Sequence, residues 1–157
     1  MAELIEICKA LELVKDFNPL QRILLTCSGT LQGTLSAFFN REVTVRLVEQ
    51  SAQTEERWPL VRRVAKLEAG NVTVCAADSL IKVADDDIHH KLLQGRVGIG
   101  QILESAGIRP SFRLLEVGQT DENFWRLYTL EASHVSYRIR EAFPRRLYPW
   151  PLPPHGT

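Results

Sequence analysis

Near the start of the chain, hydrophobic residues recur at three- and four-residue steps, which is the spacing of amphipathic helices. In the first segment the apolar positions are Leu4, Ile7, Leu11 and Val14. Asn18-Pro19 then supplies an N-cap and a first-turn proline for a second helix over LQRILL. Thr30 can cap a third helix over LQGTLSAFF. The pattern therefore predicts three helices before the first strand.

In the following segments, apolar and polar residues alternate, which predicts strands with one buried face. The run REVTVRLVEQ is one such strand, and LVRRVAKLEAGNVTVCAADSLI predicts a hairpin that turns around Ala69-Gly70-Asn71. Two short helices, over ADDDIHHKLLQG and after GRVGIG, precede three more strands in FRLLEVG, FWRLYTLEA and VSYRIREAF. Leading helices, later strands and no βαβ alternation indicate an α+β fold. We expect one domain over residues 1–157, with a largely antiparallel sheet flanked by helices and a proline-rich tail at 149–157.

Two charged residues fall on apolar strand faces. Glu141 shares its face with the apolar residues of VSYRIREAF, and Arg63 shares its face with alternate apolar residues of LVRRVAKL. A buried carboxylate is costly unless it is paired, protonated or required for function. A cavity over both residues would combine a cation for an anionic ligand with a reactive carboxyl group. A plain buried ion pair and a solvent-exposed glutamate at a strand end are the alternatives, and a shift of one residue would turn Arg62 inward instead.

The composition narrows the class of protein. The 157 residues are 45% hydrophobic and 24% charged, as in a globular domain with a core, and the formal net charge of zero argues against a nucleic acid partner. Three widely spaced cysteines without a CxxC pair indicate a reducing compartment. The charged segment MAELIEICKALELVKDF excludes a signal peptide, and no run approaches the roughly 20 apolar residues of a membrane span. We expect a cytoplasmic protein.

Three short motifs suggest cofactor or metal chemistry, but each lacks a required part. Gly98-Ile99-Gly100 has Leu103 where the dinucleotide fingerprint needs its third glycine. Ser28-Gly29-Thr30 lacks both the lysine of a phosphate-binding loop and the surroundings of a nucleophilic serine. His89-His90 are adjacent residues, which face different ways on a helix. We therefore expect neither a cofactor nor a metal.

Several segments together resemble the chorismate pyruvate-lyase family, in particular its divergent branch in cyanobacteria, mycobacteria and archaea. The segments are LQRILLTCSGTLQGTL, VTVRLVEQ, RRVAKL, AADSLI, GIG, FRLLEVG, WRLYTL and IREAFP. They follow one another in the family's order from about residue 19 to about residue 148. The resemblance implies a cofactor-free carbon–oxygen lyase that removes pyruvate from chorismate and leaves 4-hydroxybenzoate, a product compatible with quinone biosynthesis.

The resemblance also implies roles for individual residues. Glu141 matches the catalytic glutamate of the family, and Arg63 matches the arginine that binds the substrate carboxylate. Arg62 is a further substrate-binding candidate because of the doubled arginine. The remaining positions that match substrate-contacting residues are Gly29, Thr30, Ile99 and Gly100.

The chain departs from familiar members of that family at two places. Ser28 stands where they carry an acidic residue or asparagine, and Gly98 stands where they often carry proline. Two alternatives therefore stay open: a lyase for a related chorismate-derived or aromatic acid, and a non-catalytic sensor or carrier of aromatic acids. Under the lyase reading we expect chorismate as the small-molecule partner, no nucleic acid, no membrane span, and a monomer or weak dimer.

Overall fold

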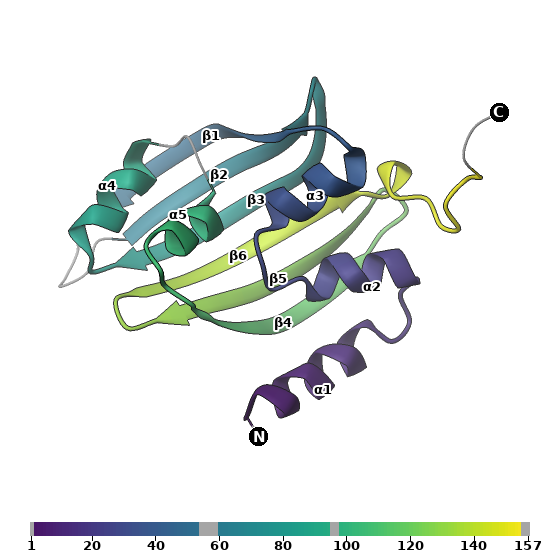
Figure 1. Ribbon diagram of the computed structural model, residues 1–157, viewed down its shortest axis with the longest axis horizontal. Helices are drawn as coiled ribbons and strands as arrows, with labels where there is room; N and C mark the ends of the chain where they lie inside the picture. Colours follow the sequence, from purple (N-terminus) through teal and green to yellow (C-terminus); the bar gives the residue numbers. More distant parts are fainter. Residues whose placement is uncertain (1, 54–59, 95–97, 155–157) are drawn as a thin grey trace.

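One antiparallel sheet of six strands forms the body of the protein, in a computed structural model that describes residues 2–53, 60–94 and 98–154 (Figure 1). The strands are β1 (Val43–Gln53), β2 (Leu60–Ala69), β3 (Val72–Val83), β4 (Ser111–Gln119), β5 (Asn123–Ala132) and β6 (Val135–Pro144). Their order is β1-β2-β3-β6-β5-β4, so two three-stranded meanders meet along β3 and β6. The predicted α+β class and the predicted hairpin over β2 and β3 are confirmed.

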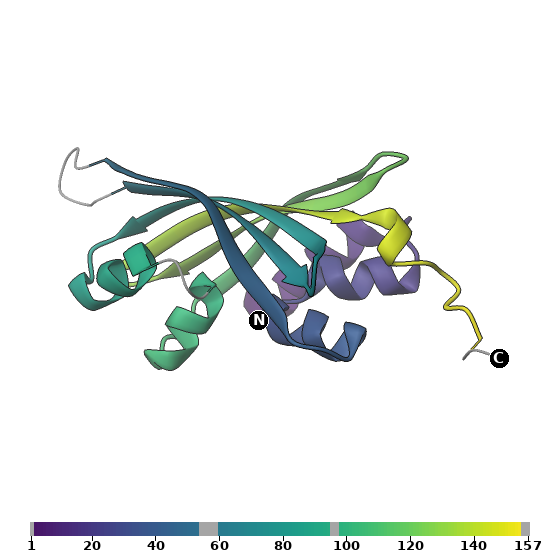
Figure 2. The same cartoon turned by 90° about the horizontal axis from the view of Figure 1, so that it is seen from above.

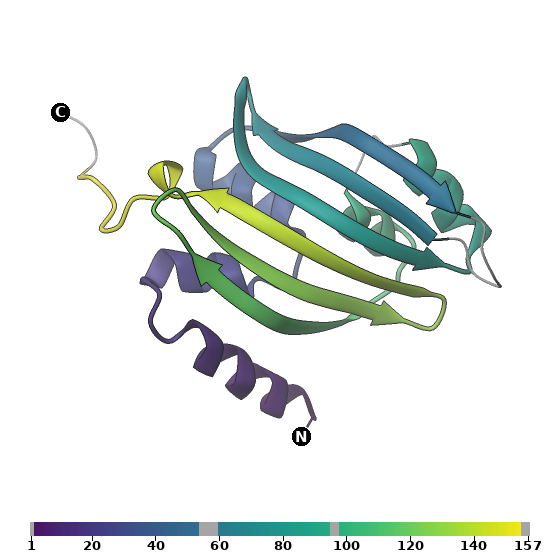
Figure 3. The same ribbon diagram turned by 180° about the vertical axis from the view of Figure 1, so that it is seen from behind.

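The helices cover one face of this sheet and leave the other face open (Figures 2 and 3). They are α1 (Ala2–Val14), α2 (Pro19–Thr26), α3 (Leu31–Phe39), α4 (Asp86–Gln94), α5 (Ile99–Ser105) and the short 3-10 helix η1 (Arg145–Leu147). The predicted start of α2 is confirmed, because the side chains and backbone N–H groups of Asn18 and Gln21 hydrogen bond reciprocally at 2.9 and 3.2 Å. The connection that carries α4 and α5 crosses from β3 to the far edge strand β4.

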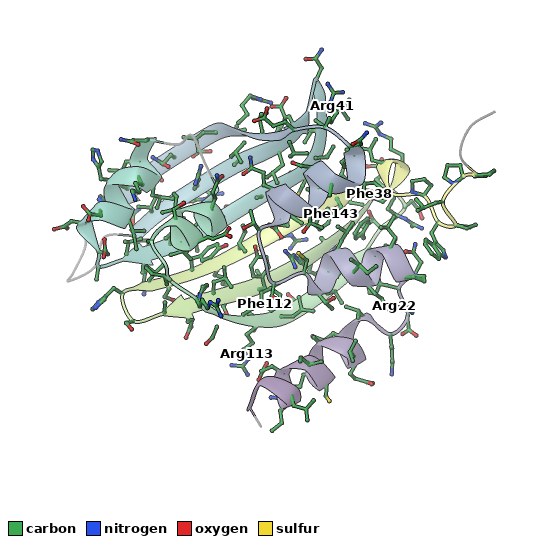
Figure 4. All side chains as sticks on the ribbon, in the orientation of Figure 1. Arg22, Phe38, Arg41, Phe112, Arg113 and Phe143 are labelled. Carbon is green, nitrogen blue, oxygen red and sulfur yellow. The ribbon has the colours of Figure 1, made fainter. Side chains whose placement is uncertain are left out.

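An aromatic cluster packs one end of the helical layer against the sheet. Phe38 of α3 and Phe143 of β6 lie at this end (Figure 4). The ring of Tyr148 contacts both, with centroid distances of 5.6 and 5.8 Å. Its hydroxyl donates a 2.6 Å hydrogen bond to the carbonyl of Val74. This end of the molecule is therefore filled, and the space between helices and sheet opens farther along the strands.

Helix α1 forms where the periodicity predicts it, but its predicted apolar face is not buried. Leu4, Ile7 and Leu11 are 63%, 51% and 56% exposed, and only Val14 is fully covered. The reason is the position of α1, which lies beside the edge strand β4 rather than over the face of the sheet (Figure 1). Of the four predicted apolar positions of this helix, only Val14 therefore belongs to the core.

Residues 149–154 of the proline-rich tail join no strand of the sheet, as predicted. Its last residues and the segment 95–97 before α5 lie outside the described residues. No helix within residues 2–53, 60–94 and 98–154 is long and apolar enough to cross a membrane.

Candidate functional site

A cavity of about 660 Å³ lies between the sheet and the helical layer. Inward residues of the central strands form its floor, and the segments 27–32 and 98–110 form its walls. Its volume is in the range of pockets that hold small organic ligands. All six of the following predicted site residues line it: Gly29, Thr30, Arg63, Ile99, Gly100 and Glu141.

Small side chains on the central strands create this space. Ala65, Ala77 and Ser79 point into the cavity where most inward positions of the sheet carry larger residues. The strand register places Ala77 beside Glu141 on β6, and Ser79 beside Arg63 on β2. Glu141 and Arg63 therefore flank a floor of small side chains, one strand to either side of β3.

Glu141 is 4% exposed and is held by two donors from β5. The Nε–H group of Arg126 donates to Oε1 at 2.7 Å, and the hydroxyl of Tyr128 donates to Oε2 at 3.2 Å. A carboxylate is the form of glutamate that accepts from both donors and balances the guanidinium. The geometry therefore presents Glu141 to the cavity as an oriented proton acceptor.

Arg63 enters the same cavity from β2 and is also 4% exposed. Burial lowers the pKa of its guanidinium, and the nearby Tyr137 opposes this change. The pKa nevertheless begins so high that arginine stays charged at any ordinary pH. A buried guanidinium offers paired N–H donors to a planar carboxylate, so Arg63 suits an anionic ligand.

Two tyrosines complete the polar lining near Glu141. Burial raises the pKa of Tyr128 well above its ordinary value and raises that of Tyr137 as well, and the negative charge of Glu141 adds to both shifts. Both phenols therefore remain protonated donors through the neutral pH range. Their rings meet edge to face with centroids 6.3 Å apart, which gives this part of the cavity an apolar wall.

The loop before α3 and helix α5 face each other at the cavity. Thr30 occupies the predicted N-cap position of α3, but its hydroxyl donates to Glu104 of α5 at 2.8 Å instead of capping the helix. A Cβ atom added to Gly29 or Gly100 would meet no heavy atom within 4 Å. Packing does not require glycine at these two positions, which border open space.

Arg62 does not belong to the site. It lies on the exposed face of β2, where its guanidinium pairs with Asp78 at 3.2 Å. Since successive side chains of a strand point to opposite faces, Arg63 faces the cavity and Arg62 faces away from it. This placement corrects the assignment of Arg62 as a substrate-binding residue.

Arg126 is the charged residue at this site that the sequence analysis missed, together with the lining residues Tyr128 and Tyr137. The alternation in FWRLYTL places it on the same face as Phe124, Tyr128 and Leu130, and all four are buried. The signal was the same as for Glu141, namely a charged residue on the apolar face of a strand. Among the described residues, the buried charged side chains are Arg63, Arg126 and Glu141.

The site and fold together define an α+β protein with a ligand-sized cavity that contains an oriented carboxylate and a buried cation. Comparison with protein-family models finds no match, and comparison with curated proteins finds none either. The resemblance to chorismate pyruvate-lyases therefore stays a prediction.

Proposed function

We propose that this protein is a chorismate pyruvate-lyase, which converts chorismate into 4-hydroxybenzoate and pyruvate. One observation carries the proposal: Glu141 and Arg63 face one cavity from either side of a floor made of Ala77 and Ser79. These are the two residues that the sequence resemblance assigns to proton transfer and to carboxylate binding.

In this proposal the substrate is bound as a dianion whose ring lies over the small side chains of β3. Arg63 forms a charge-assisted contact to one of the two carboxylates and so fixes the orientation of the ring. Tyr128, Tyr137 and Ile139 supply an apolar wall for the ring on the side of β5 and β6. A ring held in this way extends from Arg63 toward Glu141 across Ser79 and Ala77.

The proposed reaction is an elimination that makes the ring aromatic. Glu141 accepts the proton from the ring carbon that bears the hydroxyl group, and the electron pair of that C–H bond enters the ring. The neighbouring carbon–oxygen bond to the enolpyruvyl group breaks, and the released enolpyruvate takes up a proton to become pyruvate. Aromatisation provides the driving force, so the protein contributes orientation and one proton acceptor, and the mechanism requires no metal or cofactor.

A comparison of matched glutamate variants tests the role of Glu141. Glu141→Gln keeps the size and hydrogen-bonding capacity of the side chain but removes the proton acceptor, so we expect turnover of chorismate to fall by about 100-fold or more. Glu131→Gln makes the same chemical change at an exposed position of β5 and serves as the control. Formation of 4-hydroxybenzoate is followed by chromatography with metal-free protein. Equal turnover in both variants would remove Glu141 from the mechanism.

The same assay separates the two alternative functions. Tight binding of 4-hydroxybenzoate without turnover of chorismate by the wild-type protein would identify an aromatic-acid sensor or carrier. Pyruvate release from another chorismate-derived acid, but not from chorismate, would identify a lyase with a different substrate. Both outcomes contradict the proposal as stated.

We further propose that the reaction takes place in the cytoplasm. Cys8, Cys27 and Cys75 are all free thiols, which supports a reducing compartment. Cys75 is fully buried, and burial raises the pKa of its thiol well above the ordinary value, so it acts as a small core residue.

A further inference from the structure

Arg126 joins the carboxylate of the cavity to one of the cavity walls. It is 1% exposed and lies directly opposite Glu141 in the pairing of β5 with β6. Its Nε–H group donates to Glu141 at 2.7 Å, while a terminal N–H group donates to the carbonyls of Leu25 and Cys27 at 3.2 and 2.7 Å. One guanidinium therefore binds both Glu141 and the chain that leads into the loop at 28–30.

The aromatic residues around Arg126 also belong to the cavity. Its guanidinium lies 4.3 Å from the ring centroid of Tyr128 and 5.7 Å from that of Phe112, and both rings line the cavity. Tyr128 in turn donates its hydroxyl to the second oxygen of Glu141. These contacts fix the plane of the guanidinium, and with it the direction in which the carboxylate faces the cavity.

The charge of Arg126 acts on the same group. Burial lowers the pKa of its guanidinium, but Glu141, Tyr128 and Cys27 together outweigh this effect, with Glu141 the largest of the three, so the pKa is raised. The guanidinium lies 2.7 Å from Oε1 of Glu141 and balances the buried negative charge of that carboxylate. Removing this cation would leave a buried carboxylate beside apolar walls, where protonation is favoured.

We infer that Arg126 is the positioning residue of this site, which keeps Glu141 ionised and aimed at the ligand and holds the loop at 28–30 against it. The role of Glu141 in proton transfer rests on the proposed function. The charge and the orientation of Glu141 do not depend on it.

The kinetic test compares Arg126→Met and Arg126→Lys with the matched variant Arg63→Met, which removes the buried arginine on the other side of β3. We expect Arg126→Met to lower kcat for chorismate about 100-fold and to move the acid limb of the rate profile to higher pH. Arg126→Lys restores a cation, but an ammonium group cannot contact both Glu141 and the two backbone carbonyls. We therefore expect it to recover part of kcat and to return the acid limb toward the wild type. Arg63→Met raises KM and leaves the acid limb in place.

The spectroscopic test reads the same property without turnover. The wild type and both Arg126 variants are labelled with carboxyl-¹³C glutamate, each with and without the Glu141→Gln substitution. The infrared difference spectrum of each such pair isolates the Glu141 band. We expect a carboxylate band at neutral pH in the wild type and in Arg126→Lys, and a protonated carboxyl band in Arg126→Met. Circular dichroism checks the fold, and if Arg126→Met does not fold, Arg126→Gln, which also lacks the charge, replaces it in both tests.

Unchanged kcat and an unchanged acid limb in the Arg126 variants would overturn the inference. A lower kcat in both variants with the wild-type acid limb and a carboxylate band would also overturn it, because the role would then be structural only. If the wild-type protein does not convert chorismate, the lyase proposal fails, and the infrared bands alone decide whether Arg126 sets the state of Glu141.

Discussion

Three buried charged side chains lie at the cavity or directly behind its lining, and each contributes something different. Glu141 presents a carboxylate, Arg126 orients it from β5, and Arg63 provides a second cation across the floor of small residues. Strand alternation predicted the inward positions of Glu141 and Arg63, because the period of a strand fixes its two faces. It could not predict which residue pairs with Glu141, since that register depends on the turn at Ser133-His134, where the sequence lacks an Asn-Gly or Asp-Gly signal.

The first prediction at the residue scale concerns carboxylate recognition by Arg63. Replacement of Arg63 by methionine should weaken binding of 4-hydroxybenzoate by about 10- to 100-fold, because a charge-assisted hydrogen bond is worth about 1.5–3 kcal/mol. The affinity for 4-hydroxybenzyl alcohol, which lacks the carboxylate, should change much less. Isothermal titration calorimetry measures both. An equal loss for the two ligands would show that Arg63 supports the cavity and does not recognise the carboxylate.

The second prediction concerns the buried phenols at high pH. Burial raises the pKa of Tyr128 and Tyr137 above the ordinary value of about 10, so the folded protein keeps these protons after the unfolded chain has lost them. The unfolded state then binds fewer protons, and the free energy of unfolding must fall as the pH rises above about 10. Urea denaturation at a series of alkaline pH values measures this loss, which Tyr137→Phe should reduce.

A buried aromatic residue without a hydroxyl group provides the control for this measurement. Phe124 is fully buried, so Phe124→Leu should lower the free energy of unfolding by a similar amount at every pH and leave its alkaline slope unchanged. The contrary result is a free energy of unfolding that falls with the same slope above about pH 10 in the wild type, Tyr137→Phe and Phe124→Leu. The phenol of Tyr137 would then not contribute to the pH dependence of stability.

At the scale of elements, β3 is important because its inward residues are small. Ala77 and Ser79 leave the space that larger residues on neighbouring inward positions would fill. Sequence alternation predicts the hairpin of β2 and β3, but it does not predict the cavity. A cavity depends on which helices cover the strand, and that arrangement is set by contacts distant in sequence.

A larger side chain in the cavity should abolish ligand binding without lowering the stability of the fold. Ala77→Leu adds apolar volume inside the cavity, so we expect it to abolish binding of 4-hydroxybenzoate while the melting temperature is kept or raised. Ala76→Leu adds the same volume on the exposed face of β3 and should leave binding unchanged. Calorimetry and thermal unfolding are the two measurements. Wild-type affinity in Ala77→Leu would mean that the ligand does not occupy this cavity.

Helix α1 contributes less to the fold than its hydrophobic pattern suggests. Leu11 is 56% exposed, so we expect Leu11→Ala to change the free energy of unfolding by less than about 1 kcal/mol. Leu35 of α3 is fully buried, and Leu35→Ala should cost about 2–5 kcal/mol. Chemical denaturation compares the two variants. A cost at Leu11 as large as that at Leu35 would show that α1 packs more deeply than this arrangement allows.

At the scale of the whole molecule, the site forms where the two meanders meet. Pairing of β3 with β6 brings Ala77 beside Glu141, and pairing of β2 with β3 brings Arg63 beside Ser79. The order of elements and the α+β class followed from sequence periodicity, because helices and strands are encoded locally. The strand order did not follow, since β3 and β6 are separated by four other elements and no local signal joins them.

The central claim is that this cavity eliminates pyruvate from chorismate. The most direct measurement is the amount of 4-hydroxybenzoate and of pyruvate formed over time by purified, metal-free protein from a known amount of chorismate. The account predicts that the two products appear at the same rate in a one-to-one ratio, and that Glu141→Gln suppresses both. No release of either product, or release of one without the other, would contradict it.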